Sequence, residues 1–134
     1  MTTTKIEAIF DVAVEPIWEI VTSLNDVKWR SDLSRIEVLK DQKNFIEYTK
    51  QGIATRFTIT EFKPLMFYAF SMDNDSISGK WTGEFFSLGK YKTRIIFKEE
   101  VTAKKIYMRP FVKGYLIKQQ KTYIRDLTNY LSRL

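Results

Sequence analysis

The stretch from Ile36 to Val101 constrains the fold most, because short runs of alternating polar and apolar residues follow one another there. The runs are rich in β-branched and aromatic residues, which favour strands. They are separated by turn-forming residues at Asp41–Lys43, Gln51–Gly52, Lys63–Pro64, Asp73–Ser76 and Gly89. Short strands joined by such turns predict an antiparallel meander of six strands.

The segment before the meander predicts one more strand and two short helices. The run "KIEAIFDV", residues 5–12, alternates as a half-buried strand does. Pro16 then suits the first turn of a short helix, residues 16–24. Asn25 and Asp26 interrupt that helix, and they predict a second short helix from Trp29 to Leu33.

The last hairpin of the meander has a predicted register if Gly89 is the centre of its turn. Facing pairs on the inner side are then Phe85 with Thr93, Gly83 with Ile95, and Trp81 with Phe97. On the outer side Glu84 meets Arg94 as an opposite-charge pair. Odd-numbered positions therefore point inward here, and Glu84 is interpreted as an exposed partner of Arg94 instead of a catalytic acid.

A long amphipathic helix is expected to close the chain, after Pro110 and Gly114. One of its faces collects Val112, Leu116, Gln120, Tyr123, Leu127, Tyr130, Leu131 and Leu134. Gln120 is an amide inside this apolar stripe, and a buried amide without a partner costs roughly 1–3 kcal/mol. We expect it to find a backbone group, a tyrosine, a water or a ligand. Residues 116–123 are predicted to face a cavity, and residues 127–134 to seal its far end.

The charge of the chain is concentrated at its C-terminal end. The net charge is +6, and residues 101–134 hold eight basic residues and only one acid, Asp126. One hypothesis is an anionic partner at Lys118, Lys121 and Arg125, and the alternative is a solvated helix face. Nucleic acid is disfavoured as that partner, because the aromatic residues are predicted to be buried instead of lying among the basic ones.

The absence of histidine and cysteine restricts the chemistry, because it removes the commonest general base and the usual zinc ligands. No carboxylate is predicted on an inward strand face, and Glu47 and Arg56 are interpreted as belonging to polar strand faces. We expect no catalytic residue, metal or cofactor.

With no secretory signal and no apolar run long enough to span a membrane, we expect a cytoplasmic protein. We expect it to be a single domain, residues 1–134, and a monomer or weak dimer.

Three segments resemble one known superfamily. They are "FDVAVEPIWEIVTSLNDVKWRSDL", "ITEFKPLMFYAFSM" and "GKWTGEFFSLGKYKTRIIFKEEV". Their order resembles that of the SRPBCC or START-like superfamily, and most of all its polyketide cyclase/dehydrase-like proteins. The resemblance implies an α+β helix-grip fold. In that fold a curved antiparallel sheet of about seven strands, with two short helices after its first strand, wraps around a long C-terminal helix over a cavity for small apolar molecules.

The leading functional hypothesis is therefore the binding or carrying of a small hydrophobic or amphipathic molecule in that cavity. The candidate ligand-binding residues are Trp29, Tyr48, Phe57, Tyr68, Trp81, Phe85, Tyr107, Leu116, Gln120 and Tyr123. Two alternatives stay open. One is a polyketide cyclase/dehydrase-like enzyme, which would need an ionisable side chain facing the cavity. The other is a non-catalytic interaction module that uses the basic face of the last helix.

Overall fold

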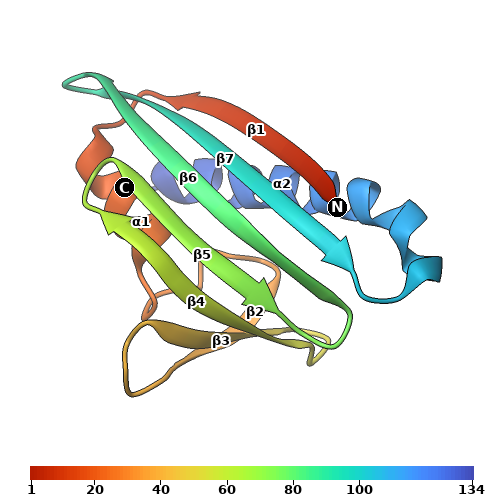
Figure 1. Cartoon of the computed structure of the whole chain (residues 1–134). Helices are drawn as coiled ribbons and strands as arrows, with labels where there is room; N and C mark the ends of the chain where they lie inside the picture. The colour runs from red at the N-terminus through yellow and green to blue at the C-terminus, as the bar shows by residue number, and fades with distance from the viewer.

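Seven antiparallel strands form one curved sheet in the order β1-β7-β6-β5-β4-β3-β2 (Figure 1). The computed structural model describes residues 1–134. Its strands are β1 (Thr2–Phe10), β2 (Leu33–Val38), β3 (Asn44–Thr49), β4 (Ala54–Lys63), β5 (Phe67–Asp73), β6 (Ile77–Gly89) and β7 (Lys92–Ala103). Its helices are α1 (Val14–Thr22), the short 3-10 helix η1 (Ile106–Met108) and α2 (Arg109–Leu131). The predicted α+β fold, with a curved antiparallel sheet of seven strands and a long last helix, is confirmed.

The first strand lies at one edge of the sheet, beside the last strand. Strands β2 to β7 pair in chain order, whereas β1 pairs with β7 along its whole length. The chain between β1 and β2 must therefore cross the sheet, and it does so through α1 and an irregular segment, residues 23–32. Figure 1 shows α2 running behind β1, β7 and β6, on the same side of the sheet as α1.

The core lies between the concave face of the sheet and the two helices. Helix α2 contacts β1 and β7, whereas α1 contacts β6. From the helices Ile17, Leu116 and Leu127 are fully buried, and from β7 Ile95 is too. Burial in β7 alternates strictly from Thr93 to Ala103, as expected for a strand with one face on the core.

The predicted register of the β6–β7 hairpin is wrong by two residues, but its faces are right. Trp81 pairs with Glu99, Gly83 with Phe97 and Phe85 with Ile95. The ladder is irregular between Ser87 and Gly89, which moves the turn along the chain. A shift of two preserves the face of every side chain, because strands alternate with a period of two. The predicted pair between Glu84 and Arg94 does not form, since Glu84 lies opposite Ile96 and Arg94 binds Glu7 at 2.9 Å.

The second short helix, predicted from Trp29 to Leu33, is absent. Leu33 begins β2, and residues 24–32 form turns. Side-chain bonds hold this segment in its turns, because the Asp26 carboxylate accepts the N–H of Lys28 and the Asp126 carboxylate, which comes from α2, accepts the N–H of Ser31. Asp side chains commonly accept backbone N–H groups in turns of this kind.

The last helix begins earlier than predicted and also ends earlier. Pro110 lies in its first turn and Gly114 lies well inside it, so neither residue precedes the helix. At the other end Leu127 and Leu131 are buried as expected. Leu134 lies beyond the helix and is 74% exposed, so it does not seal the core.

The position of Gly114 gives a test of the helix. A Cβ atom at Gly114 would meet nothing within 4 Å, so Gly114→Ala should raise the free energy of unfolding by about 0.5–1 kcal/mol, because alanine restricts the unfolded chain and favours helix. Urea denaturation followed by circular dichroism measures the change.

Gly79 supplies the matched control for the same chemical change. A Cβ atom there would overlap the carbonyl oxygen of Glu100 and lie 3.0 Å from Cα of Val101. Gly79→Ala should therefore destabilise the protein, by about 1–3 kcal/mol. A destabilising Gly114→Ala would contradict the described helix.

Candidate functional site

A cavity of about 150 Å³ lies between the concave face of the sheet, residues 21–33 and the middle of α2. It opens to the surface, and aromatic rings form much of its wall. Phe45 stacks on Phe57 with ring centroids 5.0 Å apart, and Phe70 stacks on Trp81 at 4.8 Å. The stacked pairs come from neighbouring strands, because Phe45 pairs with Phe57 in the β3–β4 ladder and Phe70 with Trp81 in the β5–β6 ladder. The cavity thus has an apolar, aromatic floor.

Most of the predicted ligand-binding residues line this one cavity. They are Trp29, Phe57, Tyr68, Trp81, Leu116, Gln120 and Tyr123. The stretch of α2 that lines it includes Tyr115, Leu116, Gln119, Gln120 and Tyr123. This stretch matches the predicted cavity-facing residues 116–123 and extends them by one residue.

Three of the predicted residues lie elsewhere. Tyr48 is on the outer face of β3, where its hydroxyl donates to Glu37 and Arg35 stacks on its ring. Phe85 is buried, but it packs against Trp18 at 4.9 Å between ring centroids, away from the cavity. Tyr107 is in η1 and is 69% exposed. Aromatic character alone therefore does not distinguish the cavity from the rest of the core or from the surface.

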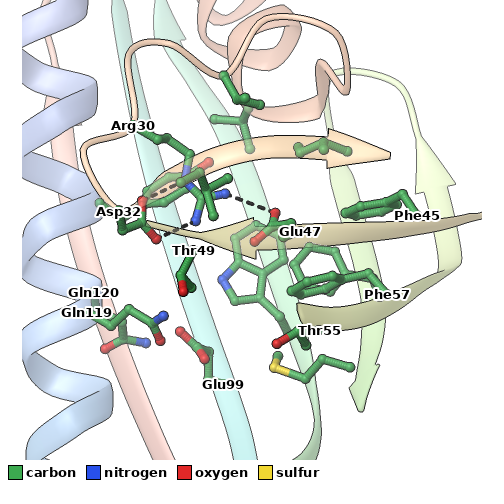
Figure 2. Close-up of a pocket in the computed structure, with 18 of the residues that line it drawn as sticks. Arg30, Asp32, Phe45, Glu47, Thr49, Thr55, Phe57, Glu99, Gln119 and Gln120 are labelled. Atoms are coloured by element: carbon green, nitrogen blue, oxygen red, sulfur yellow. Dashed lines mark hydrogen bonds and ion pairs between the residues drawn. The ribbon is translucent and has the colours of Figure 1, made fainter. Parts of the chain in front are cut away.

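A buried ion cluster lies at one end of the cavity (Figure 2). The Arg30 guanidinium makes two hydrogen bonds to Asp32, at 2.9 and 3.2 Å, and one to Glu47 at 3.0 Å. The side chains of Arg30 and Glu47 are each only 14% exposed. Because Arg30 comes from the irregular segment and Glu47 from β3, the cluster ties residues 23–32 to the sheet.

The charges of the cluster affect one another strongly. Burial opposes the charge on Arg30, but Glu47 and Asp32 outweigh burial, so the pKa of Arg30 lies above its ordinary value. Burial raises the pKa of Glu47, although the charge of Arg30 acts in the opposite direction. One guanidinium faces two carboxylates, so the cluster as a whole has one excess negative charge when both acids are ionised.

Glu99 is a third acid in the cavity and has no partner. It is 8% exposed and points inward from β7, and no hydrogen bond or ion pair joins its carboxylate to another side chain. Burial raises its pKa to about 7, with Arg30 lowering it and Glu47 raising it further. A carboxyl group of this kind changes its charge near neutral pH.

An amide and a hydroxyl lie beside Glu99. Thr4 of β1 pairs with Glu99 in the sheet, and its buried hydroxyl has no partner. The Gln120 amide donates to the Thr4 carbonyl oxygen at 3.4 Å, a long hydrogen bond that leaves the amide oxygen free. Figure 2 shows the Glu99 carboxylate directed toward the side of Gln119 and Gln120. Of the partners expected for Gln120, the structure shows a backbone group, and the side chain also lines the cavity.

Residues 23–32 are also fixed to α2. The backbone N–H and the hydroxyl of Ser31 both donate to the Asp126 carboxylate at 2.8 Å. Trp29 packs edge-on against Tyr123, with ring centroids 5.1 Å apart, and its buried indole N–H has no acceptor. Asp126, the one acid in the basic C-terminal segment, is therefore a structural anchor.

The expectation of no inward carboxylate is wrong for Glu47 and Glu99. The strand period contains the signal for both, because Glu47 is two residues after the inward Phe45 and Glu99 is two residues after the inward Phe97. Arg30 and Asp32 have no comparable signal, since they lie in an irregular segment without a period. No group of three or more acidic side chains is arranged to hold a metal ion.

The basic residues assigned to an anionic partner lie outside the cavity. Lys118, Lys121 and Arg125 are all exposed on the outer side of α2. Their role in binding an anionic surface stays a prediction. None of the helices is both long and apolar enough to cross a membrane.

Comparison with known proteins shows the fold. No family model matches the sequence, and no curated protein matches it. Among solved structures, it is similar to a START superfamily protein from Mycobacterium smegmatis, with a TM-score of 0.87, 13% identity, and coverage of 98% of this chain and 97% of the other. It is also similar to the Zhui aromatase/cyclase from Streptomyces sp. R1128, with a TM-score of 0.82, 10% identity, and coverage of 98% and 94%.

A conserved protein from Geobacillus kaustophilus has a TM-score of 0.83 at 10% identity, with 98% of this chain and 96% of the other covered. All three matches span nearly the whole chain at low identity. The chain therefore has a START-like, helix-grip fold.

The unpartnered acid predicts an unusual dependence of stability on pH. The folded-state pKa of Glu99 is above its unfolded value of 4.5, so its charge disfavours the fold above about pH 7, and this penalty disappears as the pH falls below 4.5. Glu99→Gln should therefore stabilise the protein at pH 8, on the order of 1–3 kcal/mol, and the gain should shrink as the pH falls to 5. Urea denaturation at a series of pH values measures it.

Glu100→Gln is the control, because Glu100 is the next residue of β7 and points outward. It forms ion pairs with Lys80 and Lys98 at 3.4 and 3.7 Å. Removing the Glu100 charge should leave the free energy of unfolding within about 1 kcal/mol of the wild-type value at every pH. Equal effects of the two substitutions would mean that Glu99 is not a buried, unpartnered acid.

Proposed function

We propose that the protein binds or carries a small hydrophobic or amphipathic molecule in the cavity between the sheet and α2. The observation that carries the proposal is a cavity with an aromatic floor and a cluster of polar groups without full sets of partners. Ligand sites in proteins are mostly apolar and have a few polar groups that fix orientation.

The arrangement of the cavity supports an amphipathic ligand over a purely apolar one. The stacked rings of Phe45, Phe57, Phe70 and Trp81 offer one apolar side. Glu99, Gln119 and Gln120 offer polar atoms on the side next to α2. A molecule with an apolar body and one polar group would satisfy both sides, whereas a hydrocarbon would leave the buried polar atoms unpartnered.

The structural neighbours are consistent with this proposal. One is described as a START superfamily protein and another as an aromatase/cyclase. A shared fold hosts several activities, so the proposal depends on the cavity itself.

Ligand binding should stabilise the protein in a thermal-denaturation panel of lipids, sterols and aromatic compounds. A ligand present at about 100 times its Kd adds about 2.7 kcal/mol. Trp81→Ala and Gln120→Leu should each lower the affinity for a compound that binds by at least about tenfold, because the first removes an aromatic wall and the second removes a polar contact. Mass spectrometry of the purified protein would detect a ligand that co-purifies.

Phe86→Ala is the matched control for Trp81→Ala, because Phe86 lies on the outer face of the same strand and is 39% exposed. It should leave ligand affinity unchanged. If no compound in a broad panel shifts the unfolding temperature, and no ligand co-purifies, the proposal of a binding or carrier protein fails.

A second candidate function is a polyketide cyclase-like enzyme, and Glu99 is the observation that favours it. Ring closure of a polyketide needs a base that removes a proton from a carbon between two carbonyl groups. A general base works best when its pKa is near the working pH, and burial holds the pKa of Glu99 at about 7. Glu99 also lies against the aromatic floor, through its sheet pair with Trp81.

The enzyme hypothesis has its own test. Incubation with a linear poly-β-ketone analogue should yield a cyclised product that chromatography detects, with a rate that rises through about pH 7 as Glu99 ionises. Glu99→Gln should lower the rate by at least about 100-fold, whereas Glu100→Gln should leave it unchanged. Equal rates with and without the protein would remove this function and leave the binding proposal in place.

A further inference from the structure

The cavity has one basic side chain, and that side chain is already neutralised. Arg30 is the only lysine or arginine among the residues that line the cavity, and both Asp32 and Glu47 bind it. Its guanidinium makes three charge-assisted hydrogen bonds with these two carboxylates, which occupy most of its donors. An anionic ligand such as a fatty acid would therefore find no free cation.

The acidic side chains are in excess. Asp32, Glu47 and Glu99 line the cavity together with Arg30, so the ionised lining carries two more negative charges than positive ones. Glu99 lacks a partner although it is nine-tenths buried. A buried carboxylate without a partner is costly, and a cation brought by a ligand would remove that cost.

Aromatic residues lie near Glu99 in the cavity wall, although the Arg30 guanidinium already lies over the Tyr123 ring, 5.1 Å from its centroid. Trp81 is its neighbour in the β6–β7 ladder, and Tyr115 and Tyr123 of α2 line the same cavity. Tryptophan and tyrosine rings attract a positive charge placed over their faces. The free amide oxygen of Gln120 adds a hydrogen-bond acceptor for an N–H group. Carboxylate, amide oxygen and aromatic rings together form the chemistry that recognises an ammonium group.

The size of the cavity limits the rest of the ligand. A dry cavity of about 150 Å³ in a protein core holds a molecule the size of benzene, and the cavity here has about that volume. A single ring or a short chain fits inside this space, whereas a sterol or a long acyl chain would extend out of it through the opening.

We infer that the cavity ligand is a small hydrophobic cation, an amine on one ring or a short apolar chain, with its ammonium group against the Glu99 carboxylate and its apolar body against Trp81 and Phe70. This inference rests on the proposed binding function and names the ligand class for the same cavity. It requires no covalent step.

Binding of such a cation should depend on pH, because the ligand binds the ionised form of Glu99. The charged or titratable groups around Glu99 are Arg30 and Asp32 from the irregular segment, Glu47 from β3, Tyr68 from β5, and Tyr115 and Tyr123 from α2. Burial raises the pKa of each of the three tyrosines above its ordinary value, so they stay neutral. Affinity for the amine should therefore rise through about pH 7, where Glu99 loses its proton, and then level off.

Three probes of similar shape test the inference by isothermal titration calorimetry: 2-phenylethylamine, 2-phenylethanol and phenylacetate. At pH 8 the amine should bind at least about tenfold more tightly than the alcohol, and phenylacetate should bind most weakly. Lowering the pH from 8 to 6 should lower the affinity for the amine about tenfold, because about nine-tenths of Glu99 is then protonated. The affinity for the alcohol should not change.

Variants assign the preference to the named side chain. Glu99→Gln keeps the shape of the side chain and should lower the affinity for the amine about tenfold, with little change for the alcohol. Glu100→Gln removes the same charge from the outer face and should leave both affinities as in wild type. Circular dichroism confirms that each variant is folded.

The outcomes separate this inference from the proposed function. If the alcohol binds as tightly as the amine, or if Glu99→Gln retains the preference for the amine, the cation inference is overturned while binding in the cavity stands. If none of the three probes binds, the inference is also overturned. The broad panel and the search for co-purifying ligands then decide separately whether the cavity binds anything.

Discussion

One helix is too narrow to cover a sheet of seven strands, and the cavity of this protein results from that difference in width. Strands lie about 4.8 Å apart, so the sheet is roughly 29 Å wide before curvature, whereas a helix with its side chains is only about 10–12 Å wide. Helix α2 contacts β1 and β7, and α1 contacts β6. From the helices, Trp18 of α1 reaches Phe62 of β4 and Tyr68 of β5, but most of the concave face of β2 to β5 is covered by aromatic side chains and residues 23–32. The cavity is the space that they leave.

The same difference in width explains why charged groups lie so deep in the protein. Residues 23–32 have no regular hydrogen bonding of their own, so side chains hold them in place. Arg30 joins them to Glu47 on the sheet, and Ser31 joins them to Asp126 on the helix. A buried ion cluster is weak evidence for stability, because desolvation offsets much of the attraction. Its clearer effect is to fix the position of an irregular segment over the cavity.

The period of the strands could be predicted from the sequence, and most of the fold follows from it. The predicted faces of β6 and β7 are correct although the register is wrong, because an error of two residues leaves the alternation unchanged. The same alternation, continued from Phe97 to Glu99, would have placed an acid in the cavity. Tyr48 was assigned to the wrong face, three residues after the inward Phe45. Arg30 could not be found in this way, since its position depends on turns that side-chain bonds create.

The distribution of the three tryptophans has a practical consequence for anyone who studies this protein. Trp29 and Trp81 line the cavity, whereas Trp18 is 6% exposed and packs against Phe85 beyond the cavity. Two of the three indoles are therefore positioned to sense whatever enters, whereas the third lies outside the cavity wall. The intrinsic fluorescence of the unlabelled chain is thus a built-in reporter of occupancy, and replacing Trp29 or Trp81 with phenylalanine one at a time would show which wall of the cavity a molecule touches.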